Sequence, residues 1–228
     1  MRKGETKRQE MLAAAEKLFC SKGYEATSVQ DILDVLHASK GGFYHHFASK
    51  EDVLKLLCAQ RAERVADFAG RALESVSGDL RRINMVLYAF MPLRQEEAPF
   101  IRMLTPLIEK SEGRAIAMIY QDALHDSFAP LLQREIAKAE ENGSVFPVVR
   151  GVESVVLHLA NRCWMEAAAL AVRCAREGER LDSAALLTAL EKYRRAVEVL
   201  LDAPYGSIEV IRIEEWCRIA DELRLLQN

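Results

Sequence analysis

Apolar residues near the N-terminus recur at the three-and-four spacing that places side chains on one face of a helix. Between residues 28 and 36 these residues are Val29, Ile32, Leu33 and Leu36. Thr27 or Ser28 can cap this helix, because Gln30 and Asp31 follow them at the capping-box spacing. The pattern therefore predicts a short helix over residues 28–36.

A second short helix is expected directly after it. His37 and Ala38 fill the turn, Ser39 can act as the N-cap, and Phe43 and Phe47 lie four residues apart on the inward face. The outward positions are Lys40, Gly41, Gly42, Tyr44 and His45. Two short helices in this order are typical of a helix-turn-helix unit, whose second helix enters the DNA major groove.

Longer helices are predicted on both sides of this pair. Residues 6–22 carry one apolar face and end before Gly23, and a helix over residues 49–74 starts with Ser49 as a cap over Asp52. Lys50 lies in the first turn of that helix, where a cation opposes the helix dipole. A phosphate contact would explain a lysine at this position.

The rest of the chain also reads as helical, so the predicted fold class is all-α. A helix over residues 115–142 should be kinked at Pro130, and sustained apolar stripes mark helices over residues 151–174 and 184–201. A further helix is expected from about Ser207, although the SIEVIRI segment at its start also has strand-like β-branched content.

The two apolar stripes fit either the core of one subunit or a four-helix dimer interface. Their residues are Val156, Leu159 and Cys163 in the first and Leu186, Leu190, Tyr193 and Val197 in the second.

Residues 27–51 resemble the N-terminal DNA-binding domain of the TetR/AcrR family. The resemblance rests on Thr27, Ile32, Ser39-Lys40-Gly41, Phe43-Tyr44-His45-His46-Phe47 and Ser49-Lys50-Glu51. Two positions depart from the family pattern, His37 where glycine is usual in the turn and Gly42 where many members carry a larger side chain. Histidine tolerates positive φ, so the turn is expected to be kept.

The resemblance implies a homodimeric transcriptional regulator, a repressor that a ligand controls on a palindromic operator. It implies a DNA-binding domain over residues 1–50 and a ligand-binding and dimerisation domain over residues 51–228, with the two apolar stripes pairing across a four-helix dimer interface. The residues expected at DNA are Thr27, Ser28, Gln30, Ser39, Lys40, Gly41, Gly42, Tyr44, His45 and Lys50.

Charge supports DNA as a partner only through its distribution. The chain has a net charge of −3, but residues 1–50 hold 8 Lys+Arg and 6 Asp+Glu, a net of +2. No run approaches the roughly 18–20 apolar residues that cross a bilayer, and no export signal follows the N-terminus. We therefore expect a cytoplasmic protein without a membrane partner.

Catalytic and metal chemistry find no support in the residue pattern. The five cysteines form no Cys-x-x-Cys pair, and no two histidines share a helix face with a carboxylate at metal-ligand spacing. No nucleophile elbow, phosphate-binding loop or His-Glu-x-x-His helix is present. We expect no enzyme, no cofactor and no metal.

Aromatic and methionine side chains in the body can line a pocket for a small apolar or aromatic ligand. The residues expected there are Phe90, Phe100, Met103, Tyr120 and Trp164. Two alternatives stay open: a DNA-binding protein of the same fold without an inducer, acting on chromosome organisation or through a protein partner, and a helical enzyme with a helix-turn-helix-like head.

Overall fold

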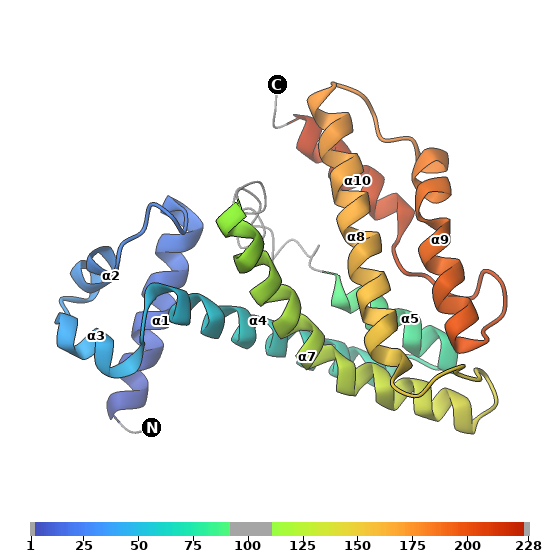
Figure 1. Ribbon diagram of the computed structural model, residues 1–228, viewed down its shortest axis with the longest axis horizontal. Helices are drawn as coiled ribbons and strands as arrows, with labels where there is room; N and C mark the ends of the chain where they lie inside the picture. The colour runs from blue at the N-terminus through green and yellow to red at the C-terminus, as the bar shows by residue number, and fades with distance from the viewer. Residues whose placement is uncertain (1–2, 92–110, 226–228) are drawn as a thin grey trace. The chain divides into compact units, whose positions relative to one another are not determined.

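The computed structural model describes residues 3–91 and 111–225, and within these ranges the chain forms helices and connecting segments without a β-strand. Figure 1 shows the helices in chain order. They are α1 (Lys3–Lys22), α2 (Val29–Leu36), α3 (Lys40–His46), α4 (Lys50–Ala72), α5 (Asp79–Phe90), α7 (Ser111–Glu141), α8 (Val152–Arg176), α9 (Ser183–Leu201) and α10 (Ile213–Leu225), with a 3₁₀ turn at Leu73–Ser75. The predicted all-α class is confirmed.

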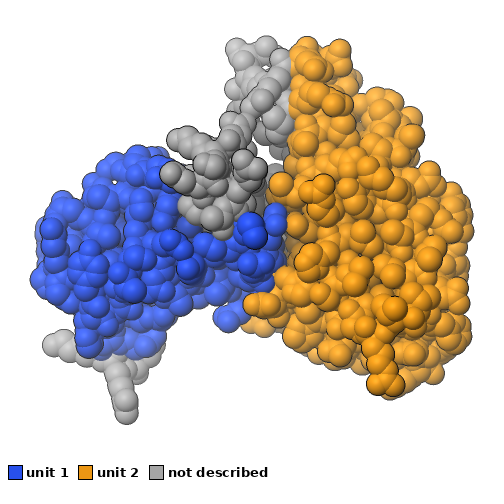
Figure 2. All heavy atoms as spheres, viewed as in Figure 1, with its two compact units in different colours: residues 1–64, 92–124 blue, residues 65–91, 125–228 orange. Residues whose placement is uncertain are grey.

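The chain divides into two compact units, which Figure 2 colours separately. The first contains residues 1–64 and 92–124, and the second contains residues 65–91 and 125–228. Two of the three boundaries fall inside helices, after residue 64 within α4 and after residue 124 within α7. The functional division at residue 50 stays a prediction.

In the first unit, α1, α2 and α3 surround a small apolar core. Both phenylalanines predicted to face inward from α3 are buried there, and their rings lie 5.3 Å apart. The other fully buried large side chains of this core include Met11, Leu12, Phe19, Ile32, Leu33 and Leu54. Arg8 of α1 lies over the Phe47 ring at 5.7 Å, so the first helix closes over the end of α3.

In the second unit, α8 packs against both α9 and α10. Glu166 of α8 accepts hydrogen bonds from Lys192 Nζ at 2.8 Å and from the Tyr193 hydroxyl at 2.7 Å on α9. Pro130 lies inside a helix that remains continuous from Ser111 to Glu141, so the predicted single helix through this proline is confirmed. Within the described ranges, no helix is both long and apolar enough to cross a membrane.

The predicted start of the last helix was wrong. The structure begins α10 at Ile213, and residues 207–212 are not helical. The Asn84 side chain explains this, because its amide donates to the Ser207 carbonyl at 2.9 Å and its oxygen accepts from the Glu209 amide at 3.0 Å. These bonds hold the segment against α5.

Most side chains of the apolar stripes on α8 and α9 are buried within the single chain. Five of the seven residues predicted at a dimer interface are at most 4% exposed in the single chain, namely Val156, Cys163, Leu186, Leu190 and Val197. Leu159 and Tyr193 are half-buried. A side chain already buried by its own chain adds little area to an interface, so the five contribute to the core of the single chain, and their part in a dimer interface stays a prediction.

Candidate nucleic-acid interface

The two short helices are fixed by the capping residues that the sequence indicated. Ser28 and Asp31 form a capping box on α2, with the Asp31 amide donating to Ser28 Oγ at 3.1 Å and the Ser28 amide donating to Asp31 Oδ2 at 2.6 Å. Ser39 accepts from the Gly42 amide at 3.2 Å and so caps α3. His37 between them adopts φ 49° and ψ 40°, which confirms that this histidine keeps the left-handed turn.

The face of α3 opposite its buried phenylalanine is open to solvent. Lys40, Gly41, Tyr44 and His45 are all exposed, and 59% of Tyr44 is accessible. A Cβ added at Gly41 would meet no atom within 4 Å, whereas one at Gly42 would lie 3.4 Å from Ser39 Oγ. This face combines a cation, a phenol and an imidazole beside a bare backbone, which suits contact with DNA bases and phosphates.

Thr27 does not belong to that exposed surface. The residue is 1% exposed, and its hydroxyl donates to the Gly23 carbonyl at 2.7 Å. The side chain therefore serves the turn between α1 and α2, and a DNA contact by this residue stays a prediction. Ser28 and Gln30 are exposed beside it, although Gln30 also donates to Asp34 at 2.7 Å.

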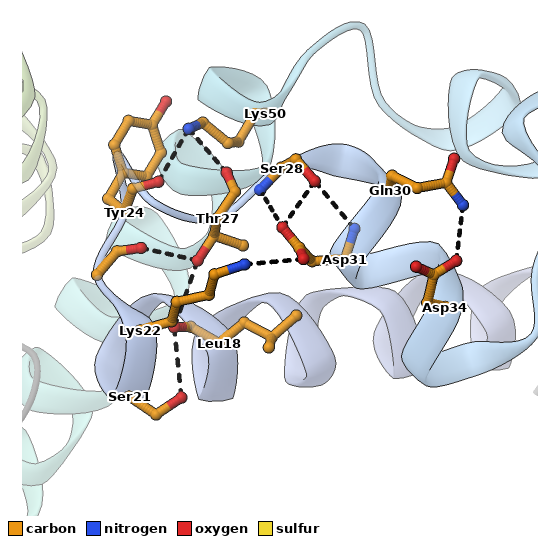
Figure 3. Close-up of polar contacts among 11 residues, drawn as sticks. Leu18, Ser21, Lys22, Tyr24, Thr27, Ser28, Gln30, Asp31, Asp34 and Lys50 are labelled. Carbon is orange, nitrogen blue, oxygen red and sulfur yellow. Dashed lines mark hydrogen bonds and ion pairs between the residues drawn. The ribbon is translucent and has the colours of Figure 1, made fainter.

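Lys50 has two partners within its own chain. Figure 3 shows its ammonium reaching the turn before α2, where it donates to the carbonyls of Tyr24 and Thr27, each at 2.9 Å. The nitrogen also lies 4.2 Å from the centre of the Tyr24 ring. Burial is the largest influence on this side chain and lowers the pKa of Lys50. The predicted phosphate contact stays a prediction, with one N–H of the ammonium left for it.

One ion pair of this region was not predicted from the sequence. Lys22 pairs with Asp31 at 2.8 Å, and hydrogen bonds from Lys22 and then Ser28 lower the pKa of the Asp31 carboxyl well below its usual range. The capping-box spacing pointed to Asp31, but no local signal indicated its partner on α1.

The predicted ligand residues are only partly described. Phe100 and Met103 lie outside the described residues. Phe90 is buried in the second unit against Phe128, with ring centres 5.4 Å apart, and Tyr120 is buried in the first unit. Trp164 is half-buried, and its indole Nε1 is buried without a hydrogen-bond partner among the described residues. A ligand site formed by this set stays a prediction.

An open groove of about 800 Å³ lies elsewhere in the second unit. It is bounded by Cys163 of α8, by α9 between Leu187 and Arg194, and by residues 206–214. Besides two residues assigned above to the dimer interface, Cys163 and Leu190, it contains none of the predicted site residues.

Thiol and metal chemistry gain no site within the described ranges. Burial raises the pKa of Cys58 and of Cys163 to about 12, so both remain protonated near neutral pH. Among the described residues, no group of three or more His, Cys, Asp or Glu side chains is placed to hold a metal ion.

The geometry of α2 and α3 defines a helix-turn-helix DNA-binding protein. A family model described as "Bacterial regulatory proteins, tetR family" matches residues 11–57, which include both helices. Residues 11–57 thus match the DNA-binding domain of the TetR family, and this match together with the curated relatives supports a transcriptional regulator of that family.

Curated relatives agree with this family. The chain is 24% identical over 147 residues to the HTH-type transcriptional repressor KstR2 of Mycolicibacterium smegmatis, covering 58% of this chain and 72% of that protein. It is 34% identical over 61 residues to the repressor AcnR of Corynebacterium diphtheriae, covering 27% of this chain and 32% of that protein. The AcnR match thus spans about a third of the relative's length.

Solved structures share the fold over most of the chain. The fatty acid degradation regulator FadR from Bacillus halodurans has a TM-score of 0.55 at 15% identity, with 84% of this chain and 94% of that chain covered. FadR from Bacillus subtilis, solved with stearoyl-CoA, has the same TM-score at 14% identity, with 86% and 99% covered. At these identities the likeness shows the fold alone.

Proposed function

We propose that the chain is a homodimeric repressor that binds a palindromic DNA operator and responds to a small apolar or aromatic ligand. The observation that carries the DNA part is the solvent-exposed face of α3, held by the Ser39 cap and by the buried Phe43 and Phe47. Several curated relatives are named repressors, which supports the direction of regulation.

An exposed apolar surface supports the homodimer. Residues 146–148 lie beside the C-terminal end of α9. The Phe146 amide donates to the Leu201 carbonyl at 2.8 Å, and the Val148 amide donates to the Leu200 carbonyl at 3.0 Å. We define the apolar patch as the large exposed side chains at this end of the α8–α9 hairpin, namely Phe146, Val148, Val149, Val155 and Val199. Exposed apolar clusters of this kind mark interaction sites, and a second copy of the chain is the occupant we propose.

Two observations support the proposed response to a ligand: a protein of the same fold that was solved with a ligand, and one buried polar atom. The FadR of Bacillus subtilis, which has this fold, was solved with stearoyl-CoA. In this chain, the buried Trp164 Nε1 offers a hydrogen-bond donor that has no partner among the described residues. Titrating the protein–DNA complex with stearoyl-CoA and with small aromatic acids tests this part, and release of DNA by any of them supports it.

Replacing Lys40 or Tyr44 by alanine is expected to weaken binding to the specific DNA site by about 1–3 kcal/mol, if each side chain meets a base edge. Binding titrations compare each variant on the specific duplex and on a random duplex. The exposed α3 face supports a larger loss on the specific duplex. Equal losses on both duplexes would instead indicate that these residues contact the DNA phosphates, because phosphate contacts do not depend on the base sequence.

Lys55→Ala provides a matched control for these titrations. Lys55 is an exposed lysine that pairs with Glu51 at 2.8 Å. It belongs to α4 and is therefore not part of the exposed α3 face. Its replacement should leave the ratio of specific to random binding unchanged.

A further inference from the structure

The turn between α1 and α2 is held by one side chain of α4 and by one side chain of the turn itself. From α4, Lys50 Nζ donates to the carbonyls of Tyr24 and Thr27. From within the turn, Thr27 Oγ1 donates back to Gly23 at the end of α1. Ser28, the next residue, is the N-cap of α2. The ammonium therefore acts on the backbone one residue before the N-cap of α2, the first of the two short helices (Figure 3).

A second tie joins α4 to α1. Arg61 is 8% exposed, and its guanidinium donates to Glu16 Oε1 at 2.7 Å. Arg61 lies about 16 Å along α4 from Lys50, at about 1.5 Å per residue. Two separated attachments fix both the position and the direction of this part of α4 against α1 and the turn.

We infer that Lys50 is a positioning residue for DNA recognition, which sets the start of α2 relative to α4 through the Tyr24–Thr27 turn. The inference rests on the DNA-binding function proposed above and deepens it. A charged donor forms stronger hydrogen bonds to carbonyls than a neutral one, and the partly buried setting of Lys50 strengthens them further. Ser28 and Gln30, which are exposed in the first turn of α2, move with that turn when the Lys50 bonds are lost.

The test separates positioning from a phosphate contact. Three variants of the full chain are compared, Lys50→Met, Lys50→Arg and the control Lys55→Met from the same helix. The specific probe is a duplex that the native chain selects in vitro from a randomised pool, and the second probe is a random duplex. Affinities are measured over a range of salt concentrations, at a temperature at which circular dichroism shows each variant to be folded.

The expected result is a loss of about tenfold or more for Lys50→Met on the selected duplex and less than about threefold on the random duplex, with the salt slope unchanged. Lys50→Arg should recover most of the loss, since a guanidinium also donates to two carbonyls. Lys55→Met should bind like the native chain. Equal losses on both duplexes with a salt slope lower by about one would overturn the inference in favour of a phosphate contact. Unchanged binding by Lys50→Met would overturn it as well.

Two further measurements keep the inference testable. If Lys50→Met does not fold, Lys50→Gln replaces it, because its side-chain amide keeps two N–H donors without the charge. A salt slope reduced by about one in this variant also overturns the inference. If the native chain selects no duplex, the proposed function fails, and amide exchange then tests Lys50 alone. The amide exchange rate in α2 should rise about tenfold in Lys50→Met, while the exchange rate in α1 stays unchanged. The same exchange rate in α2 of the native chain and of the variant would refute the inference.

Discussion

Replacing Val199 by glutamate is expected to convert the dimer into monomers and to weaken operator binding by about a hundredfold or more. Val199 is 59% exposed near the end of α9, and glutamate has the higher helix propensity, so the chain should stay folded. A carboxylate in the apolar patch would be buried without a partner once a second subunit covers it. Operator binding falls because two linked heads add their free energies on one palindrome, whereas a single head makes too few contacts.

Sedimentation equilibrium measures this directly, since the native chain should give twice its mass of 25.7 kDa and the variant that mass alone. Leu187→Glu is the matched control. Leu187 is 54% exposed on the same helix but lines the groove instead of the apolar patch. A Val199→Glu chain that remained dimeric would place the interface on another surface.

Replacing Glu135 by alanine is expected to lower the free energy of unfolding of the second unit by about 3–5 kcal/mol. Glu135 is 2% exposed on α7 and accepts from Arg82 Nε of α5 at 2.6 Å. The same guanidinium also donates to the Leu73 and Val76 carbonyls, so one ion pair joins α7, α5 and the turn after α4. Without Glu135, the charge of Arg82 loses its main partner in a partly buried position.

Urea denaturation measures the loss, and Glu140→Ala is the control, because Glu140 is an exposed acid of the same helix. Its replacement should change stability by no more than about 0.5 kcal/mol. Removing both charges with Arg82→Met and Glu135→Leu should recover much of the loss, as expected when a buried ion pair is replaced by apolar packing. A Glu135→Ala chain as stable as the control would show that the ion pair contributes nothing.

The same residue predicts an acid-dependent loss of stability. Burial raises the pKa of Glu135, but the hydrogen bonds from Arg82 and Arg134 outweigh burial, and the net pKa lies below the ordinary value of 4.5. A lowered folded-state pKa adds stability that is complete above the unfolded value and is lost as the pH falls towards the folded value. The stability difference between the native chain and Glu135→Gln should therefore be constant above about pH 5 and shrink below it.

The sequence predicted those parts of the head that depend on neighbouring residues. The Ser28–Asp31 capping box, the Ser39 cap and the inward Phe43 all involve residues no more than four positions apart. Such local interactions leave a readable spacing in the chain.

The sequence could not predict contacts whose partner is distant in the chain, and it left two explanations open for a periodic apolar stripe. Lys50 meets carbonyls 26 and 23 residues before it, and the Ser207 segment is held by Asn84, 123 residues away. An apolar stripe such as that of Leu186 and Leu190 shows that a helix face is covered, but the spacing does not tell whether its own chain or a second copy covers it. Here the chain itself does.

The central claim is that this chain recognises a two-fold symmetric DNA sequence through the exposed face of α3. Selection of duplexes from a randomised pool by the full-length chain, followed by sequencing, tests it most directly. We expect the native chain to enrich an inverted repeat whose half-site centres lie about 34–36 Å apart, or a multiple of that spacing. The double variant with Lys40→Ala and Tyr44→Ala should no longer enrich this repeat. Recovered duplexes without a shared sequence, or with the same repeat enriched by the double variant, would contradict it.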